Sequence, residues 1–371
     1  MSSDNEFALL SNSPIEVQDN QLNLRVLHRI SSASTIKSVY IESHSNSPAS
    51  SVGQKNELQL IKEAQIQRLN KPVNLNILIL GDSNIGKTSL INAMLLKHFG
   101  IVNSKLEKPN NLRPTRTVIE SNGSISNNEL ELRVTLIDTP GYGFFTCKEK
   151  WLETMVELII GKALDYKKFK KLVPKNLLED NRVHAALFLI EGPRCKETDL
   201  DLIFNLQKYI SIIPILAKSD SYSANELIQV KLSIISQCAE AGISFYDIAS
   251  AMGNKVIELS LSPLGPVPPF AIISGGNAIE KNGKICFIRK YTWGQCDIHN
   301  KSCSDFRILC RLLFGHLVIP IIDTAKFMNK KTLKFLKTKE KKIKSNNEFN
   351  KKANRFRRIS NFAARFILNM L

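Results

Sequence analysis

The residues with the clearest chemistry stand at 81–88, a stretch with two glycines that ends in a lysine and a threonine. It reads G-D-S-N-I-G-K-T and matches the phosphate-loop pattern G-x-x-x-x-G-K-[ST] at every fixed position. Backbone N–H groups in such a loop, together with the start of the next helix, attract phosphate oxygens. We expect Lys87 to reach the β- and γ-phosphate oxygens and the Thr88 hydroxyl to hold Mg²⁺. The predicted phosphate-binding residues are Gly81, Asp82, Ser83, Asn84, Ile85, Gly86, Lys87, Thr88 and Ser89.

A carboxylate suited to the same metal follows about fifty residues later. Asp138-Thr139-Pro140-Gly141 comes directly after an apolar run. We expect Asp138 to hold the metal and the Gly141 amide to sense the third phosphate. These four residues also form a common turn, so their place at the end of a strand is what makes them informative.

A threonine is also needed to close over the third phosphate and the metal. Thr115 and Thr117 are the two candidates for this catalytic switch threonine, and the sequence does not choose between them. No glutamine stands beside residues 138–141 to orient an attacking water. We therefore expect slow hydrolysis at best.

The base of the nucleotide has its own candidate residues. Ala217-Lys218-Ser219-Asp220 ends a buried apolar run and resembles the guanine-reading motif [NTA]-K-x-D. The Asp220 carboxylate accepts hydrogen bonds from the N1–H and the 2-amino group of guanine, whereas adenine leaves it unpaired. The Lys218 stem is expected along the base. An exposed turn is the simpler interpretation of these residues, but with the two upstream motifs the pattern favours GTP or GDP.

These groups need a scaffold, and the chain supplies alternating strands and helices. This alternation predicts an α/β fold of the P-loop GTPase type, with a mainly parallel sheet and helices on both faces. Ligands of such sheets lie beyond the carboxyl ends of the strands, where the phosphate loop stands. The expected strands are 76–80, 130–137, 184–190, 210–216 and 270–274, the expected helices 89–96, 149–164, 198–209 and 224–241, and a further β element at 284–298 precedes a helix at 305–317.

The bulk composition narrows the class of protein. With 371 residues and 43% hydrophobic content, the chain is long enough for one large domain with appendages. No run of eighteen apolar residues predicts a membrane span, and residues 1–6 lack the features of a secretory signal. Cys296, Cys303 and Cys310 recur every seven residues, a spacing that could hold a metal. Reduced thiols in a cytoplasmic protein are the expected state of the seven cysteines.

The net charge of +17 is unevenly distributed. Residues 325–371 hold fifteen Lys and Arg against two acids, a net +13, so the rest of the chain is close to neutral. We expect a disordered Ser/Asn-rich arm at 1–55, a nucleotide domain at 56–283 that opens with a helix near 57–69, a separate element at 284–325 and a basic tail at 326–371. No recognisable RNA-binding module accompanies the tail, so nucleic acid is not an expected partner.

The basic tail has two parts. Lys326–Lys352 is a lysine run without sustained heptads, expected to be solvated. Arg355–Leu371 places apolar residues at helical spacing with arginines mostly on the other face. This pattern is typical of a helix lying on an anionic membrane surface, and it equally fits a helix that packs on a partner subunit.

Five further runs of the chain form a recognisable set. They are L-R-V-T-L-I-D-T-P-G-Y-G at 132–143, D-N-R-V-H at 180–184, I-I-P-I-L-A-K-S-D at 212–220, R-K-Y-T-W-G at 289–294 and S-D-F-R-I-L at 304–309. Together they resemble the septins, guanine-nucleotide-binding proteins that form filaments at the eukaryotic cell cortex. The resemblance covers roughly 70–325, and the element after the nucleotide domain is its most specific part.

The resemblance implies further roles. Gly275 and Arg289 would contact the guanine nucleotide near its base, and His184 would lie at a subunit interface across the nucleotide. The protein would bind GTP or GDP and join other septins in filaments on the membrane, at the cell cortex or division site (a septin ring, or a forespore membrane). It would act there as a scaffold or diffusion barrier. The alternative is a soluble regulatory or ribosome-assembly GTPase whose turnover is its function.

The sequence also departs from the family pattern. Asn84 stands where the phosphate loop usually has glycine, Phe144 replaces an aspartate, and Thr292 replaces a proline. The usual acidic segment after W-G has become Gln295–Ile298. These changes fall on the switch region and on possible partner contacts and leave the fold intact, which indicates a diverged, specialised septin.

Overall fold

The computed structural model describes residues 72–100, 115–126, 131–174, 177–252, 267–273, 276–281, 284–292 and 294–338. The expected arm at 1–55, the helix near 57–69, Gly275 and the terminal helix Arg355–Leu371 lie outside these ranges. Leu130, Ser274, Trp293 and the part of the lysine run beyond Thr338 also lie outside them, and the remaining parts of the predicted strands and helices fall within them.

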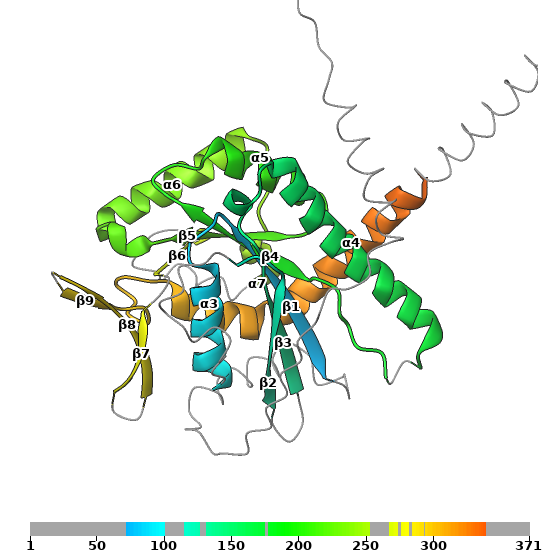
Figure 1. The fold of residues 1–371 in the computed structure, drawn as a ribbon, viewed down its shortest axis with the longest axis horizontal. Coiled ribbons are helices and arrows are strands. Elements are labelled where there is room, and N and C mark those ends of the chain that lie inside the picture. Colours follow the sequence, from blue (N-terminus) through cyan, green and yellow to red (C-terminus); the bar gives the residue numbers. More distant parts are fainter. Residues whose placement is uncertain are drawn as a thin grey trace, which may run out of the picture.

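A six-stranded sheet in the order β2-β3-β1-β4-β5-β6 forms the centre of the molecule (Figure 1). Every neighbouring pair is parallel except β2 with β3. The sheet therefore confirms the predicted parallel α/β architecture. Its strands are β1 (Val73–Gly81), β2 (Ile119–Ser126), β3 (Glu131–Asp138), β4 (Ala185–Glu191), β5 (Ile212–Ala217) and β6 (Phe270–Ile272).

The edge strand β2 was not predicted from the sequence. It reads I-E-S-N-G-S-I-S, which is polar and interrupted by Gly123, and such residues have low strand propensity. A side chain at Gly123 would meet the Phe99 ring at 2.5 Å. The antiparallel pairing with β3 and the contact with the Phe99 ring therefore stabilise this strand. Its local strand propensity alone would not.

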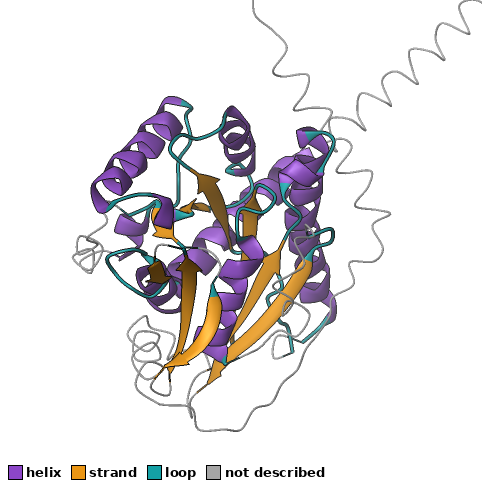
Figure 2. Cartoon of the chain, turned by 60° about the vertical axis from the view of Figure 1, so that its left-hand side comes forward, coloured by secondary structure: helices purple, strands orange, loops and turns teal. Residues whose placement is uncertain are grey.

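Helices cover both faces of the sheet (Figure 2). Successive residues of a strand point to opposite faces, and β1 shows this directly: Leu75, Ile77 and Ile79 join one apolar core, and Leu78 and Leu80 join the other. The helices are α3 (Lys87–Met94), α4 (Lys148–Leu172), α5 (Glu197–Leu206), α6 (Ala224–Glu240) and α7 (Ile248–Met252), with a π-helical turn at Leu95–Phe99.

A second, antiparallel sheet follows, in the order β7-β8-β9. The chain then enters α8, a π-helical turn and a long helix that is orange in Figure 1. The predicted β element and the predicted helix are both present. The bounds are β7 (Asn277–Lys281), β8 (Lys284–Tyr291), β9 (Gly294–Asp297), α8 (Phe306–Arg311), the turn Leu312–His316 and the helix Val318–Thr338.

The described lysines of the run from Lys326 are exposed, as predicted, but the first part of the run is helical and one face of that helix is buried. The helix continues to Thr338, and Ala325 and Leu336 are 3% exposed. Apolar or small residues recur every three or four positions here between the lysines, which gives the helix one face that packs and one that is solvated.

A buried ion pair ties α6 to the segment before α8. Lys231 Nζ lies 2.7 Å from Asp305 Oδ2, and both side chains are 0% exposed. Asp305 Oδ2 also accepts from the Ala271 amide at 2.8 Å, and the Asp305 amide donates to the Ala271 carbonyl at 2.7 Å. Asp305 therefore joins α6, β6 and the S-D-F segment through one carboxylate.

Within the described ranges, no single helix is both long and apolar enough to cross a membrane, although the bent pair Phe306–His316 and Val318–Thr338 meets that test when taken together. No group of three or more His, Cys, Asp or Glu is placed to hold a metal ion among those residues. The six cysteines with described side chains are free thiols.

Candidate nucleotide-binding site

The phosphate loop connects β1 to α3 and depends on left-handed backbone conformations. Gly81, Asn84 and Gly86 have φ values of 137°, 58° and 108°. A side chain at Gly81 would also meet the Leu189 carbonyl oxygen at 2.7 Å. Asparagine adopts positive φ more readily than other residues with a side chain. Asn84 therefore adopts the left-handed conformation that the loop has at this position.

Lys87 lies folded over its own loop. Its ammonium donates to the carbonyl oxygens of Gly81 at 3.3 Å and Asp82 at 2.5 Å, and the residue is 5% exposed. Burial lowers the pKa of Lys87 to about 8, although the nearby carboxylates of Asp138 and Asp82 act in the opposite direction. The cation is thus desolvated and held at the loop, where an incoming phosphate would meet it.

The predicted metal ligands lie together beside this lysine. The Thr88 hydroxyl donates to Asp138 Oδ2 at 2.6 Å and lies 3.3 Å from the Thr115 hydroxyl. Asp138 is 1% exposed, and its Oδ1 has no hydrogen-bond partner in the described ranges. Burial raises the pKa of Asp138 despite the bond from Thr88 and the charge of Lys87. These hard oxygen donors, with one buried carboxylate oxygen unpaired, fit Mg²⁺.

The structure also separates the two candidate threonines. The Thr115 hydroxyl is 3.5 Å from Asp138 Oδ2, whereas Thr117 is exposed to solvent. Thr115 thus lies with the metal-site residues and Thr117 does not. The choice depends on how residues 115–118 approach β3, which neither residue type nor spacing reveals.

The turn after β3 packs directly on the phosphate loop. A side chain at Gly141 would lie 2.3 Å from the Ser83 amide nitrogen, so only glycine fits. Tyr142 follows and donates its hydroxyl to Asp199 Oδ1 at 2.8 Å. On the same side, Lys196 lies 2.8 Å from Asp82 Oδ2. The 138–141 turn is therefore in contact with the loop.

The residues predicted to read the base lie at the end of β5. Lys218 has a φ of 55°, and its ammonium lies 2.6 Å from Glu191. The Asp220 side chain is 6% exposed, and its Oδ1 is buried without a partner among the described residues. Asp220 Oδ2 accepts a hydrogen bond from the Tyr291 hydroxyl and lies 3.4 Å from Arg289.

Arg289 was expected near the base, and in the structure it lies 3.4 Å from the carboxylate of Asp220, the residue predicted to read the base. Tyr291 was missed as a site residue, although it belongs to the quoted R-K-Y-T-W-G run. The sequence contains no sign of its role because 71 residues separate it from Asp220.

Strand register explains why these groups share one edge of the sheet. Asp138 is level with Ile79, Leu189 with Gly81, and Ala217 with Glu191. The carboxyl ends of β1, β3, β4 and β5 therefore meet there, as parallel α/β sheets require of a ligand site.

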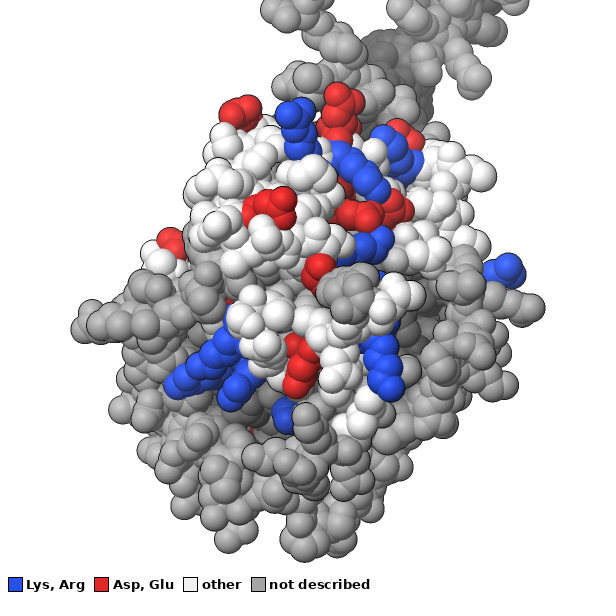
Figure 3. Space-filling model, turned by 90° about the vertical axis from the view of Figure 1, so that its left-hand side faces the viewer, with Lys and Arg blue, Asp and Glu red and all other residues white. Residues whose placement is uncertain are grey.

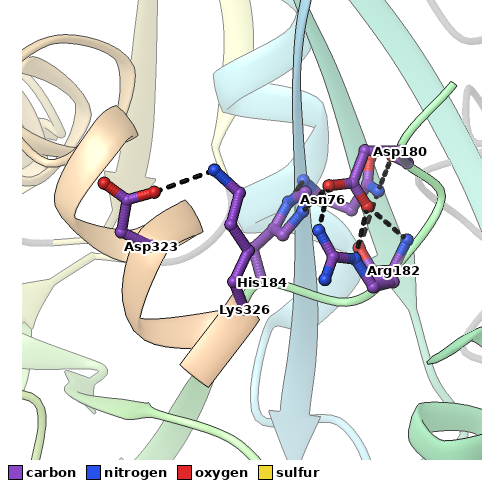
Figure 4. A network of polar contacts seen from close by, with 6 residues as sticks. All are labelled: Asn76, Asp180, Arg182, His184, Asp323 and Lys326. Atoms are coloured by element: carbon purple, nitrogen blue, oxygen red, sulfur yellow. Dashed lines mark hydrogen bonds and ion pairs between the residues drawn. The ribbon is translucent and has the colours of Figure 1, made fainter. Parts of the chain in front are cut away.

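The expectation that His184 lies at a subunit interface across the nucleotide is wrong. It precedes β4, at the end of the sheet opposite the phosphate loop, and is 0% exposed. Its Nδ1 accepts from the Asn76 amide at 2.9 Å, and its Nε2 lies 3.5 Å from Asp180 (Figure 4). Burial lowers the pKa of His184 although Asp180 opposes this. A side chain enclosed in this way cannot present itself to another subunit.

Asp180 carries the charge of this network. Burial alone would raise its pKa, but hydrogen bonds from Arg182 and His184 lower the pKa well below its usual range. Arg182 is held by Asp180 at 2.5 Å, and its guanidinium lies 4.2 Å from the centre of the Tyr166 ring. The D-N-R-V-H run thus has a structural role at the start of β4.

The sheet order, the phosphate loop and the carboxylates at the strand ends define a protein with the P-loop GTPase fold. Comparison with known proteins agrees. The septin family model matches residues 71–348. The crystal structure of the septin GTPase domain from Chlamydomonas reinhardtii superposes with a TM-score of 0.60 at 20% identity, over 71% of this chain and 99% of that one.

Relatives of known sequence include proteins named as septins. Protein peanut of Drosophila melanogaster is 27% identical over 235 residues, which are 62% of this chain and 43% of the relative. Septin-8 of Xenopus tropicalis is 30% identical over 249 residues, 64% of this chain and 55% of the relative. The chain thus spans about half the length of these relatives. It belongs to the septin family.

Proposed function

We propose that this chain is a septin subunit that binds GTP or GDP with Mg²⁺ and assembles with other septins into filaments. One observation carries the nucleotide part of the proposal. Two buried carboxylate oxygens, Asp138 Oδ1 and Asp220 Oδ1, lack hydrogen-bond partners among the described residues. They flank the phosphate loop at one sheet edge. Buried polar atoms in native proteins are nearly always paired, so both oxygens favour a ligand at that edge.

The residues take distinct roles in this proposal. The loop amides and Lys87 bind the phosphates, and Gly141 closes on the loop beside Ser83. Thr88 and Asp138 hold Mg²⁺ with Thr115 next to them. Bound Mg²⁺ would offset the charge of the β- and γ-phosphates. Asp220 selects guanine because adenine cannot offer two donors to its carboxylate.

Hydrolysis is slow or absent in this proposal. The residue after Gly141 is Tyr142, and its hydroxyl is directed to the buried Asp199 at 2.8 Å. A side chain held in this way does not orient a water at the third phosphate. The nucleotide then acts mainly as a structural cofactor, and its binding energy stabilises the subunit conformation that assembles.

Family membership supports the cellular part of the proposal. The chain would join other septins in hetero-oligomeric filaments at the cell cortex or division site, as a scaffold or diffusion barrier, including a septin ring or a forespore membrane. The face in Figure 3 carries Lys and Arg interspersed with Asp and Glu. The positive excess of the sequence is concentrated instead in the basic tail. We propose that Arg355–Leu371 binds anionic membranes.

The first test identifies the nucleotide. The purified full chain is denatured and the released nucleotide is identified, and the Kd of the emptied protein for GDP and for ADP is measured by calorimetry. We expect guanine nucleotide and a strong preference for GDP. Equal affinity for ADP, or no binding of either, would contradict the nucleotide assignment.

The second test addresses assembly and the membrane. Electron microscopy of the chain mixed with candidate septins at low salt should show rods. Rapid GTP turnover with no rods would instead favour the soluble regulatory or ribosome-assembly GTPase. Deletion of Arg355–Leu371 should abolish binding to liposomes that contain phosphatidylserine, and neutral phosphatidylcholine liposomes are the control. Binding that survives the deletion would refute the role of the tail.

A further inference from the structure

The base-reading carboxylate already has an internal partner. Tyr291, the last residue of β8, donates its hydroxyl to Asp220 Oδ2. Arg289, two residues earlier on the same strand, lies 3.4 Å from the same oxygen. Asp220 Oδ1 stays buried and unpaired within the described ranges. Oδ2 of the Asp220 carboxylate therefore accepts a hydrogen bond from the protein itself, and Oδ1 can still accept one from a ligand.

Guanine needs both oxygens for full recognition. Its N1–H and its 2-amino group donate side by side, and a carboxylate accepts them in parallel. The tyrosine hydroxyl is a donor of the same kind and occupies one of the two positions. The Tyr291 hydroxyl and the second guanine donor therefore compete for Asp220 Oδ2.

We propose that Tyr291 is an internal competitor that must leave Asp220 before guanine binds with both N–H groups. The inference rests on the proposed nucleotide function and adds to it an autoinhibitory contact from β8. It also assigns a role to two residues of the R-K-Y-T-W-G run.

The construction of β8 supports this role. In the described ranges, the strand pairs with β7 and β9 and has no pairing with the six-stranded sheet, whose strand β5 leads into the turn that holds Asp220. Tyr291 can therefore move without breaking a strand pairing of the main sheet. The Arg289 guanidinium lies 5.4 Å from the centre of the Tyr291 ring. Arg289 and Tyr291 thus contact each other as well as Asp220.

The hydroxyl also remains a donor at any physiological pH. Burial raises the pKa of Tyr291, and the hydrogen bond to Asp220 and the charge of that carboxylate raise it further. Bonds from a neutral donor to a charged acceptor are stronger than neutral pairs. Nucleotide binding therefore includes the free-energy cost of breaking this contact, which lowers the apparent affinity.

The test is Tyr291→Phe in the full chain, emptied of nucleotide and titrated with fluorescent N-methylanthraniloyl GDP. Removing the competing hydroxyl should tighten GDP binding about tenfold, the effect expected of one charge-assisted hydrogen bond. The affinity for the corresponding ADP derivative should change little. Tyr246→Phe is the matched control, since Tyr246 is also partly buried but lines a separate cavity with Ser211 and Thr324.

Two further measurements separate a competitor from a positioning residue. Inosine diphosphate lacks the 2-amino group. If Tyr291 stays on Asp220 and only orients it, GDP and inosine diphosphate should bind the unaltered protein equally, and Tyr291→Phe should weaken GDP binding. Either result would overturn the proposal. We expect GDP to bind more tightly than inosine diphosphate in both proteins.

Stopped-flow mixing gives a first test on the unaltered chain, which does not depend on the stability of a variant. In the unaltered chain the association rate should reach a plateau as GDP concentration rises, because release of Tyr291 becomes limiting. In Tyr291→Phe the rate should rise linearly. A linear rise in the unaltered chain, or an unchanged GDP affinity in Tyr291→Phe, refutes the competition and leaves the nucleotide function intact. If neither protein binds GDP at all, the proposed nucleotide function itself fails, and the competition fails with it.

Discussion

Asp305 and Asp220 are both buried aspartates at the same sheet, and they differ in what surrounds them. Asp305 Oδ2 accepts from Lys231 at 2.7 Å and from the Ala271 amide at 2.8 Å, with 0% exposure. The Asp220 side chain is 6% exposed and retains a buried oxygen with no partner in the described ranges. The two carboxylates are therefore similarly buried, but the hydrogen-bonding capacity of Asp220 is less fully used within the protein than that of Asp305. The comparison teaches that unmet hydrogen-bonding capacity, more than burial, separates a ligand site from a structural brace.

The largest effect is expected at the brace. Asp305→Ala leaves the Lys231 ammonium buried and unpaired, which should lower the free energy of unfolding by about 4 kcal/mol. Urea denaturation measures this. The double variant Lys231→Met with Asp305→Leu removes both charges and should recover much of the loss. A loss below about 1 kcal/mol in Asp305→Ala would remove the contrast with Asp220.

Asp220→Ala should affect nucleotide binding more than stability. The free energy of unfolding should fall by about 1.5 kcal/mol, clearly less than at Asp305, because the carboxylate loses only the hydrogen bond from Tyr291 and the partly exposed ion pair with Arg289. The affinity for GDP should fall about 100-fold and the preference over ADP should disappear. Calorimetry and urea denaturation on the same samples measure both. Severe unfolding of Asp220→Ala would make this residue a second brace.

Asp199, beside the phosphate loop, is a buried carboxyl whose hydrogen bonding is intermediate between that of Asp305 and that of Asp220. Burial raises its pKa from 3.8 to about 6, against the hydrogen bond from Tyr142 and the charge of Lys196. The folded state thus holds this proton more tightly than the unfolded chain does. The resulting stability is fully present below the unfolded pKa of 3.8 and is lost as pH rises through about 6.

Asp199→Asn cannot ionise and keeps an acceptor for Tyr142. Above pH 6 its free energy of unfolding should be about 2 kcal/mol higher than that of the unaltered chain, and the difference should vanish near pH 4. Thermal unfolding from pH 4 to 8 measures this. A difference that does not change with pH would show that the carboxyl is as well satisfied as Asp305.

The smallest effect concerns the backbone of the phosphate loop. Asn84 has a φ of 58°, so Asn84→Ala should cost about 1 kcal/mol of stability. Asn84→Gly adopts the same conformation freely and should stay within a few tenths of a kcal/mol. Thermal unfolding of the two variants side by side gives the comparison. Equal losses in both would show that the asparagine side chain, and not its backbone, matters there.

The chemistry of the site was largely predictable because its parts are contiguous in the chain. The phosphate loop, the Asp138 turn and the Lys218–Asp220 run each follow an apolar strand. Parallel pairing then brings the strand ends to one edge. The outlying strand β2 was not predictable, since a polar edge strand owes its form to its neighbour.

Other features depend on distance in space. The position of Thr115 beside Asp138, the contact of Tyr291 with Asp220 and the burial of His184 join segments far apart in the chain. The resemblance to septins placed His184 at an interface, whereas the packing of Asn76 and Asp180 encloses it.

The amino-acid sequence alone determined the family, the alternation of strands and helices, and the groups proposed to bind phosphate, metal and base, because local motifs and short periodicities carry that information. The tertiary structure alone decided which of those groups are satisfied inside the protein and which remain unpaired. That distinction depends on the partners each buried atom meets across the fold, and no local pattern records it.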